Sequence, residues 1–396
     1  MSRRPERAPA FGVLLLICCF IAFASYISSY MRIPVVPLFA RDLGAGTVLV
    51  GFINSAFLLM AGIFSFPLGF YSDRLGRKPL VMVGLVVSAG SAVLLAVSSA
   101  PLQILGIYAF FGLALAAIGP TLMAAVADIS PPTHLGRSYG WFTTAIYGGM
   151  SLGPALGGWL AQRLGYRPLF LISAVFLLLV VALAGAYLPG QAVARRGAHL
   201  PDWHEALKEL KSNRPLLGCW LATLGGCFGL GMFITFAPLY LDFNGLSLAQ
   251  IGVVFAVQGA VNALSRIPLG RLSDAVAKRW RQGVLGLLLV GASMAAFGFS
   301  RTFGQFLACG VFLGISMGLA FTAIGALIAE VVPPMSRGLA MGGYNTCIYL
   351  GMMSSSAIMG GVIKHLGFAS SYFITALILI GITVLFYFLI KGFQPR

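Results

Sequence analysis

The sequence has few charged residues, and acidic residues are the scarcest of them. Asp, Glu, Lys and Arg together make up 9% of the 396 residues, whereas 59% are hydrophobic and the mean hydropathy is +0.94. Such a composition excludes a soluble domain and predicts a membrane protein with several spans. The 26 Lys and Arg residues outnumber the 10 Asp and Glu residues. In so apolar a chain this excess indicates cytoplasmic loops, and we expect no nucleic acid among the partners.

Cysteine and histidine are also scarce, and neither forms a reactive pattern. The six cysteines all fall inside apolar runs, and the four histidines lie in loops or at helix ends. The sequence contains no metal-ligand spacing such as H-x-x-x-H, no nucleophile with a nearby base and no phosphate-binding loop. We therefore expect no disulfide, no metal, no cofactor and no enzymatic activity.

Twelve apolar runs bounded by proline, glycine or charge predict twelve transmembrane helices. The runs cover residues 11–40, 46–72, 79–98, 102–128, 137–162, 168–188, 215–241, 248–272, 282–300, 303–329, 337–363 and 369–391. At about 1.5 Å per residue, such runs can cross a hydrocarbon layer ~30 Å thick. With the loops assigned alternately, 19 of the 26 Lys and Arg residues fall on one side of the membrane and 5 on the other. This bias predicts a multi-pass protein of the cell membrane, inner or plasma, with both termini in the cytoplasm.

The chain repeats itself at a lag of about half its length. Pro67-Leu68-Gly69 returns as Pro268-Leu269-Gly270, and Gly51 returns as Gly252. The repeat predicts an all-α fold of two six-helix bundles in the same orientation, related by pseudo-two-fold symmetry. The expected divisions are a cytoplasmic N-terminus (1–10), an N-terminal bundle (11–188), a cytoplasmic linker with a short amphipathic helix (189–214), a C-terminal bundle (215–391) and a cytoplasmic C-terminus (392–396).

A dense group of charges separates the second and third apolar runs. It reads Gly69-Phe-Tyr-Ser-Asp73-Arg74-Leu-Gly76-Arg77-Lys78, and this spacing resembles the signature of the major facilitator superfamily. We expect Gly69 and Gly76 to permit close helix approach and a tight turn. The resemblance implies that Asp73 caps the eleventh helix and that Arg77 pairs with Asp128 at the inner end of the fourth.

The same resemblance implies a conformational latch between two bundles that rock about a central cavity. The expected latch residues occur in both copies of the repeat: Gly69, Asp73, Arg74, Gly76, Arg77, Lys78, Asp128, Arg137, Gly270, Asp274, Glu330 and Arg337. The alternative is that the basic residues among them only determine the topology.

The fifth apolar run carries a row of small residues: Gly149, Gly153, Pro154, Gly157 and Gly158. Their spacing, G-x-x-x-G-P-x-x-G-G, resembles the antiporter-associated motif of the same family, which implies export. A face of small residues also lets two helix backbones pack closely, so a plain packing ridge is the alternative.

Acidic residues are missing from the middle of every predicted span. In addition, Tyr108 stands four residues before Gly112, where the family usually carries an arginine linked to proton transfer. Coupling to protons therefore stays open. It would require Asp73, Asp128 or Glu330 to titrate near the inner surface.

Two arginines lie inside predicted spans, where a charge is costly enough to be a functional candidate. Arg32 is expected either to contact the solute or to extend to the outer interface. Arg266 is expected either to contact the solute or to pair with a carboxylate such as Glu330. The other cavity candidates are polar residues in mid-span: Tyr26, Ser29, Tyr30, Asn54, Thr143, Tyr147, Gln258, Asn262, Asn345 and Tyr349. Each of these side chains can instead hydrogen-bond a neighbouring helix.

These features together predict a secondary active transporter that works by alternating access. The favoured function is export, or antiport, of a small neutral or anionic organic or amphiphilic solute, because a cavity with arginines and no carboxylate is a poor host for a cation. Uptake of an organic anion or a sugar-like solute, flipping of a lysolipid or glycolipid, and a non-transporting membrane sensor are the alternatives. The expected partners are the solute and the lipid bilayer, and the expected state is a monomer.

Overall fold

The structure, a computed structural model, describes residues 11–188, 213–275, 278–333 and 336–391. Every regular element within these ranges is helical. The elements are α1 (Phe11–Arg32), α2 (Val36–Asp42), α3 (Thr47–Leu75), α4 (Arg77–Val97), α5 (Pro101–Ile129), the 3-10 helix η1 (Pro132–His134), α6 (Leu135–Leu164), α7 (Tyr166–Tyr187), α9 (Arg214–Phe243), α10 (Leu248–Ala275), α11 (Arg279–Phe299), α12 (Phe303–Val331) and α13 (Arg337–Ile390). The two predicted terminal segments and nearly all of the predicted linker, including its amphipathic helix, lie outside the described residues.

The helices confirm the predicted fold class, an all-α membrane protein, but the count of spans differs from twelve. Ten helical segments in the described ranges are long and apolar enough to cross a membrane. α6 is not among them because its many Gly, Ser and Thr residues lower its hydropathy. α13 counts once although it runs through two of the predicted spans, 337–363 and 369–391. The predicted runs therefore coincide with helices, except that the first run, 11–40, covers α1, a short turn and most of α2, and hydropathy alone does not separate all twelve.

The repeat is visible in the backbone at pairs of glycines with positive φ. Gly44 and Gly245 occupy equivalent positions in the two copies, have φ of 99° and 81°, and follow α2 and α9. Gly165 and Gly367 form a second equivalent pair, with φ of 87° and 75°. Gly165 separates α6 from α7, and Gly367 interrupts α13. Because side chains rarely adopt this conformation, Gly367 marks the point where α13 divides into the counterparts of α6 and α7.

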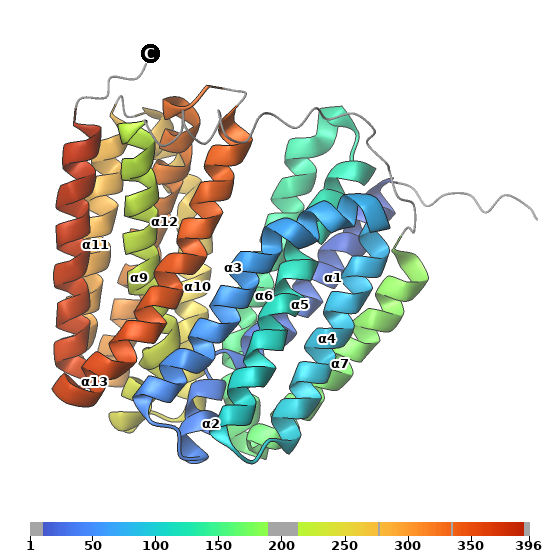
Figure 1. Cartoon of the computed structure of the whole chain (residues 1–396), viewed down its shortest axis with the longest axis horizontal. Coiled ribbons are helices and arrows are strands. Elements are labelled where there is room, and N and C mark those ends of the chain that lie inside the picture. Colours follow the sequence, from blue (N-terminus) through green and yellow to red (C-terminus); the bar gives the residue numbers. More distant parts are fainter. Residues whose placement is uncertain (1–10, 189–212, 276–277, 334–335, 392–396) are drawn as a thin grey trace, which may run out of the picture.

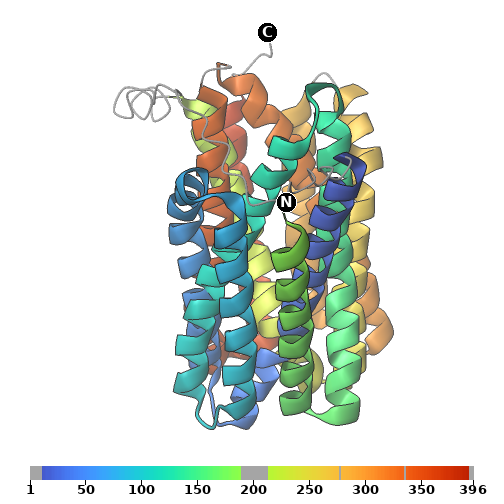
Figure 2. The same cartoon turned by 90° about the vertical axis from the view of Figure 1, so that its right-hand side faces the viewer.

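The helices form two halves that lie next to each other (Figure 1). The N-terminal half contains α1 to α7, and the C-terminal half contains α9 to α13. Seen from the side of the N-terminal half, the long helices run the length of the molecule (Figure 2). We call the end of the molecule that carries α2 the α2 end, and the opposite end, which carries η1, the η1 end.

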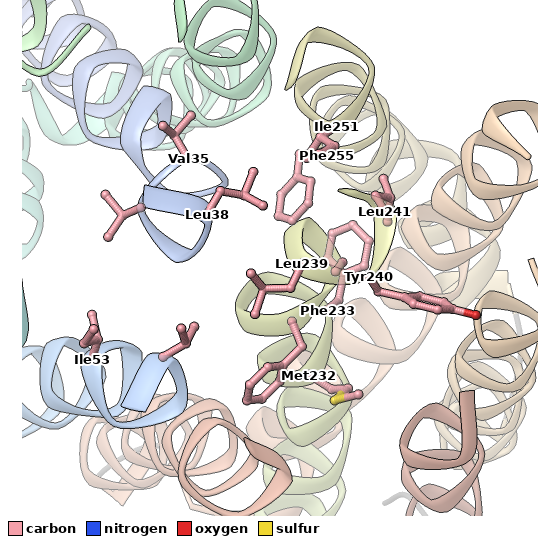
Figure 3. Close-up of a cluster of buried hydrophobic side chains, with 14 of the residues drawn as sticks. Val35, Leu38, Ile53, Met232, Phe233, Leu239, Tyr240, Leu241, Ile251 and Phe255 are labelled. Carbon is pink, nitrogen blue, oxygen red and sulfur yellow. The ribbon is translucent and has the colours of Figure 1, made fainter. Parts of the chain in front are cut away.

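The apolar core is shared between the halves at the α2 end and divided at the η1 end. The shared cluster brings Val35, Leu38 and Ile53 together with Leu239 and Phe255 of the other half (Figure 3). Two further clusters, built around α1, α4 and α5 and around α9, α12 and α13, each stay within one half. Among the described residues, the buried apolar core therefore joins the halves at the α2 end, whereas each half has its own core at the η1 end.

Candidate transport site

Small residues bring α6 and α10 into backbone contact at the α2 end. A Cβ atom at Gly158 would overlap the carbonyl oxygen of Leu248, and one at Gly252 would overlap that of Pro154. In a membrane, helices associate through such close packing because lipid already provides an apolar surrounding. Two members of the antiporter-like row, Pro154 and Gly158, therefore lie in the contact between the halves.

The contact between α3 and α13 repeats this arrangement by symmetry. A Cβ atom at Gly51 would overlap the carbonyl oxygen of Ser356, and one at Gly360 would lie 2.6 Å from that of Thr47. The Thr47 hydroxyl also donates a hydrogen bond of 2.8 Å to the Gly360 carbonyl. These positions are the repeat equivalents of those that meet between α6 and α10. The α2 end is thus closed by two equivalent backbone contacts.

The other members of the antiporter-like row hold α6 against α1 within the N-terminal half. Cβ atoms at Gly149 and Gly153 would each lie 2.7 Å from a carbonyl oxygen of α1, and one at Gly157 would overlap the carbonyl of Met31. The row thus packs on two sides, toward α1 and toward α10. Its link to antiport stays a prediction.

One ion pair joins the halves at the α2 end. Arg41 of α2 pairs with Asp242 at the end of α9, and also with its neighbour Asp42 at 3.0 Å. Arg41 and Asp242 occupy equivalent positions of the repeat, so the two halves place opposite charges there, and these meet across the pseudo-two-fold axis. The two side chains are 39% and 33% exposed, so the pair adds only about 1 kcal/mol or less to the packing.

Two ion pairs among the described residues lie at the η1 end, and each stays within one half. Arg77 of α4 pairs with Asp128 of α5 at 2.9 Å, which confirms the pair that the family resemblance implies. Arg279 of α11 pairs with Glu330 of α12 at 2.5 Å. The second pair is the copy of the first in the other half of the repeat.

The remaining latch predictions have different outcomes. The side chains of Asp73 and Asp274 lie outside the described residues, so the cap on the eleventh helix stays a prediction. Gly76, with φ of 93°, forms the predicted tight turn between α3 and α4. Gly69 was expected to permit close helix approach; no atom of the described residues lies within 4 Å of a Cβ placed there in this conformation, and the expectation stays a prediction.

Two other latch candidates, Gly270 and Arg337, make contacts inside their own half. The Cβ of a residue at Gly270 would lie 3.7 Å from Thr322 of α12, which is an ordinary contact. Arg337 donates to the carbonyl of Ala329 at 3.1 Å. The other three are basic residues that are exposed or half-buried: Arg74, Lys78 and Arg137.

Arg32 lies inside the N-terminal half, away from the second half. It is fully buried, its two terminal nitrogens donate to Ser91 at 3.0 Å and Ser88 at 3.2 Å, and its guanidinium carbon lies 4.3 Å from the ring centre of Phe111. Extension to the outer interface is therefore wrong, and so is solute contact in this conformation. Two serine hydroxyls and an aromatic face hold the charge in place of an acid.

Three polar cavity candidates are also buried. Ser29 of α1, Asn54 of α3 and Gln258 of α10 are at most 7% exposed. Ser29 Oγ and Asn54 Nδ2 have no hydrogen-bond partner among the described residues. These three side chains belong to helix packing in this conformation, and their predicted contact with a solute is not supported.

Arg266 lies where the two halves face each other. Its Nε donates to Asn262 Oδ1 at 3.1 Å, one turn earlier on α10. Its guanidinium carbon lies 5.0 Å from the ring centre of Tyr147, on α6 of the other half. The predicted pair with Glu330 is wrong, because that carboxylate pairs with Arg279. Within the described ranges, Arg266 pairs with no acid.

Tyr147 and Tyr344, one from each half, lie near this arginine, and two further tyrosines lie near Tyr147. Tyr26 and Tyr30 of α1 stack with ring centres 6.1 Å apart, and both lie close enough to Tyr147 and Tyr349 to interact electrostatically. Tyr344 of α13 interacts in the same way with Tyr147 and with the arginine. All five rings keep some accessible surface. We call these tyrosines, with Asn262 and Arg266, the seam site.

Two candidates lie nearer the η1 end, and one residue of the seam site was not predicted. Thr143 and Asn345 are exposed, one turn from Tyr147 and Tyr349 on their helices. Tyr344 was not predicted. It lies directly before Asn345 in the same span, so the criterion that selected the other candidates, a polar side chain in mid-span, could have found it.

Comparison with known proteins identifies the family. Residues 18–282 and 242–396 match the sequence profile of the Major Facilitator Superfamily. The chain belongs to this superfamily. It is therefore a transporter and not an enzyme, and its helices make it a multi-pass membrane protein.

The relatives and the solved structures are similar along nearly the whole chain. An uncharacterised transporter of this family from Methanocaldococcus jannaschii is 25% identical, covering 90% of this chain and 93% of the relative. The multidrug resistance protein MdtG of Serratia proteamaculans is 24% identical (91% and 89%), and the probable galactarate/D-glucarate transporter GudP of Bacillus subtilis is 23% identical (89% and 85%). A bacterial homolog of the human lysosomal transporter Spinster superposes with a TM-score of 0.80 at 16% identity (99% and 98%), which shows the fold.

Proposed function

We propose that this protein is a secondary active transporter of the inner membrane that exports a small neutral or anionic organic solute by alternating access. The observation that carries the proposal is the seam site. It places one arginine and five tyrosines where the halves face each other, without a carboxylate among its members. Hydroxyls and a guanidinium can bind neutral and anionic groups, whereas a cation would meet a like charge with no counter-ion.

The closed α2 end indicates on which side the solute enters or leaves in this conformation, and the relatives favour the direction. If the charge bias of the loops sets the orientation, the termini are cytoplasmic and the α2 end faces outward. The halves then pack together on the outer side and carry separate cores on the cytoplasmic side. A solute would exchange with the cytoplasm in this conformation, which is the loading step of an exporter and the release step of an importer. Similarity to MdtG, which is named a multidrug resistance protein, favours the same direction.

The coupling ion is part of the proposal. The seam site contains no carboxylate that could carry a proton in mid-span, so we propose that coupling to protons is weak or uses Asp128 and Glu330 at the η1 end. Solute exchange without a pH gradient follows from this arrangement. It is the mode in which an antiporter without a midplane acid can run.

The test is counterflow in proteoliposomes. Purified protein is reconstituted, the vesicles are loaded with one unlabelled solute, and the entry of the labelled form is measured with and without a pH gradient. We expect counterflow of at least one neutral or anionic solute in both conditions, and none of matched amines. Strong accumulation of amines alone would overturn the proposal.

A second candidate is uptake of a sugar acid or another organic anion. The similarity to GudP and the charge of Arg266, which has no acidic partner within the described ranges, favour it. Right-side-out and inside-out vesicles separate the two directions. Export predicts net solute accumulation in inside-out vesicles, whereas uptake predicts it in right-side-out vesicles.

A further inference from the structure

The guanidinium of Arg266 is fixed at one edge and open at the other. Its Nε donates to Asn262, and the two terminal nitrogens have no hydrogen-bond partner in the part of the chain that the structure describes. Unlike Arg32, whose terminal nitrogens both reach serines, Arg266 keeps accessible surface. Two terminal nitrogens side by side match the two oxygens of a carboxylate. The open edge therefore suits a planar anionic group.

The surroundings of this edge are aromatic on both sides of the seam. Tyr147 lies against the guanidinium from the N-terminal half, and the stacked rings of Tyr26 and Tyr30 lie near Tyr147 and Tyr349. Ring faces pair with aromatic groups at centre distances of about 4.5–7 Å, and hydroxyls can hydrogen-bond polar edges. A flat aromatic body bound here would contact rings from both halves.

The charge of the seam site limits the ligand to one anionic group. It contains one guanidinium, so a second carboxylate on the solute would be left without a cation in a poorly hydrated place. An amine would meet Arg266 with no acid among the seam-site residues to balance it. The site thus favours a single negative charge.

We infer that the preferred solute is an aromatic monocarboxylate, bound with its carboxylate on the open edge of Arg266 and its ring among the seam-site tyrosines. This inference rests on the proposed function, since it names the solute class of the same site. It also explains how binding reaches both halves: the carboxylate is held by α10, and the ring contacts α1 and α6.

The test measures binding of four probes to the purified protein in lipid nanodiscs by calorimetry. The probes are 2-naphthoate, the neutral alcohol 2-naphthalenemethanol, the amine 2-naphthylmethylamine and the non-aromatic cyclohexanecarboxylate. We expect 2-naphthoate to bind about 10-fold or more tightly than the alcohol, because a charge-assisted pair adds to the ring contacts. The amine should bind weakest, and cyclohexanecarboxylate should bind more weakly than 2-naphthoate.

Variants of Arg266 and Tyr147 test where the carboxylate of the solute binds. Arg266→Lys should lose most of the preference for the acid because the fork of two nitrogens is lost, and Arg266→Gln should abolish it. Tyr147→Phe should retain the preference, whereas Tyr147→Leu should weaken binding of both aromatic probes. The matched control is Arg163→Gln. Arg163 lies on α6, as Tyr147 does, but its exposed side chain is at the α2 end, so this variant should bind the probes like the parent.

The outcomes separate this inference from the proposed function. Equal binding of 2-naphthoate and its alcohol by the unaltered protein would overturn the inference, and this result needs no variant to fold. If counterflow of other neutral solutes persists in that case, the proposed function stands. A full preference for the acid in folded Arg266→Gln would also overturn the inference, because another residue would then bind the carboxylate.

Discussion

The two ends of the molecule differ in whether their contacts join the two halves or join helices of one half. At the α2 end, glycines let backbones of different halves touch, and Arg41 pairs with Asp242 across the axis. At the η1 end, the two ion pairs among the described residues join helices of the same half, Arg77 with Asp128 and Arg279 with Glu330. In the described part of the chain, glycine contacts and one ion pair therefore join the halves at the α2 end, whereas the ion pairs at the η1 end stabilise each half.

This difference predicts two classes of residue. Contacts of the first class determine whether the α2 end is closed, and contacts of the second class stabilise one half. A change in the contacts of the α2 end should alter the free energy of the closed end directly, because the proposed alternating access breaks those contacts when this end opens. A change in a pair within one half should affect both conformations alike, since the half moves as a unit. The comparison therefore predicts large shifts in population from one end and small shifts from the other.

The largest effect is expected from Gly158→Leu, which breaks the contact between α6 and α10. Its side chain cannot fit against the carbonyl of Leu248, so the closed α2 end should lose about 1–3 kcal/mol, roughly 5- to 150-fold in population. The opening is measured by labelling Leu239→Cys, a position buried in the shared cluster, from the outer side, which is the side that the α2 end faces in the proposed orientation. Gly90→Leu on α4 is the control, because no atom lies within 4 Å of a Cβ there. Equal labelling in both variants would show that the glycine contact does not hold this end closed.

A smaller effect is expected from the charges at the same end. Asp242→Arg places two arginines together across the axis and should open the α2 end by about fivefold or less, since the pair is partly exposed. The exchange Arg41→Asp with Asp242→Arg should restore part of the closed population. Because salt screens such charges, the single variant should approach the parent at about 1 M salt. A single variant as closed as the parent at low salt would mean that the pair is only a surface contact.

The smallest effect is expected from Asp128→Asn at the η1 end. It removes a pair within one half, so outer labelling of Leu239→Cys should change by less than about twofold, even if the melting temperature falls. Glu330→Gln is the matched variant in the second half. Solute counterflow without a pH gradient should survive in both. If either variant opens the α2 end as far as Gly158→Leu does, the division between the two ends is wrong.

Much of the fold could be predicted from the sequence, because hydropathy, loop charge and the repeat all act along the chain. Eleven of the twelve runs each lie in one helix, and the first covers α1 and most of α2. Hydropathy does not identify α6 as a span because α6 is too polar, and it counts α13 once although Gly367 divides it. The pair of Glu330 could also have been predicted, since the repeat carries Arg77 and Asp128 onto Arg279 and Glu330.

The roles of the two arginines could not be predicted in the same way. The charge of Arg32 is held by Ser88 and Ser91, and nothing in their sequence distinguishes them from serines that pack against lipid or other helices. The place of Arg266 depends on how two halves meet, through Tyr147 of a helix far away in the chain. Contacts between bundles leave no periodic pattern in the chain, so only the three-dimensional arrangement shows them.

The central claim is that the two ends open alternately, and distances between spin labels at both ends test it most directly. One pair of labels, at Arg163→Cys and Phe243→Cys, spans the α2 end, and a second pair, at Arg137→Cys and Met341→Cys, spans the η1 end; all four positions are exposed, and the native cysteines are replaced. Adding a transported solute should populate a longer distance at the α2 end together with a shorter one at the η1 end, in the same fraction of molecules. Distances that change in the same direction at both ends, or at one end alone, would contradict the account.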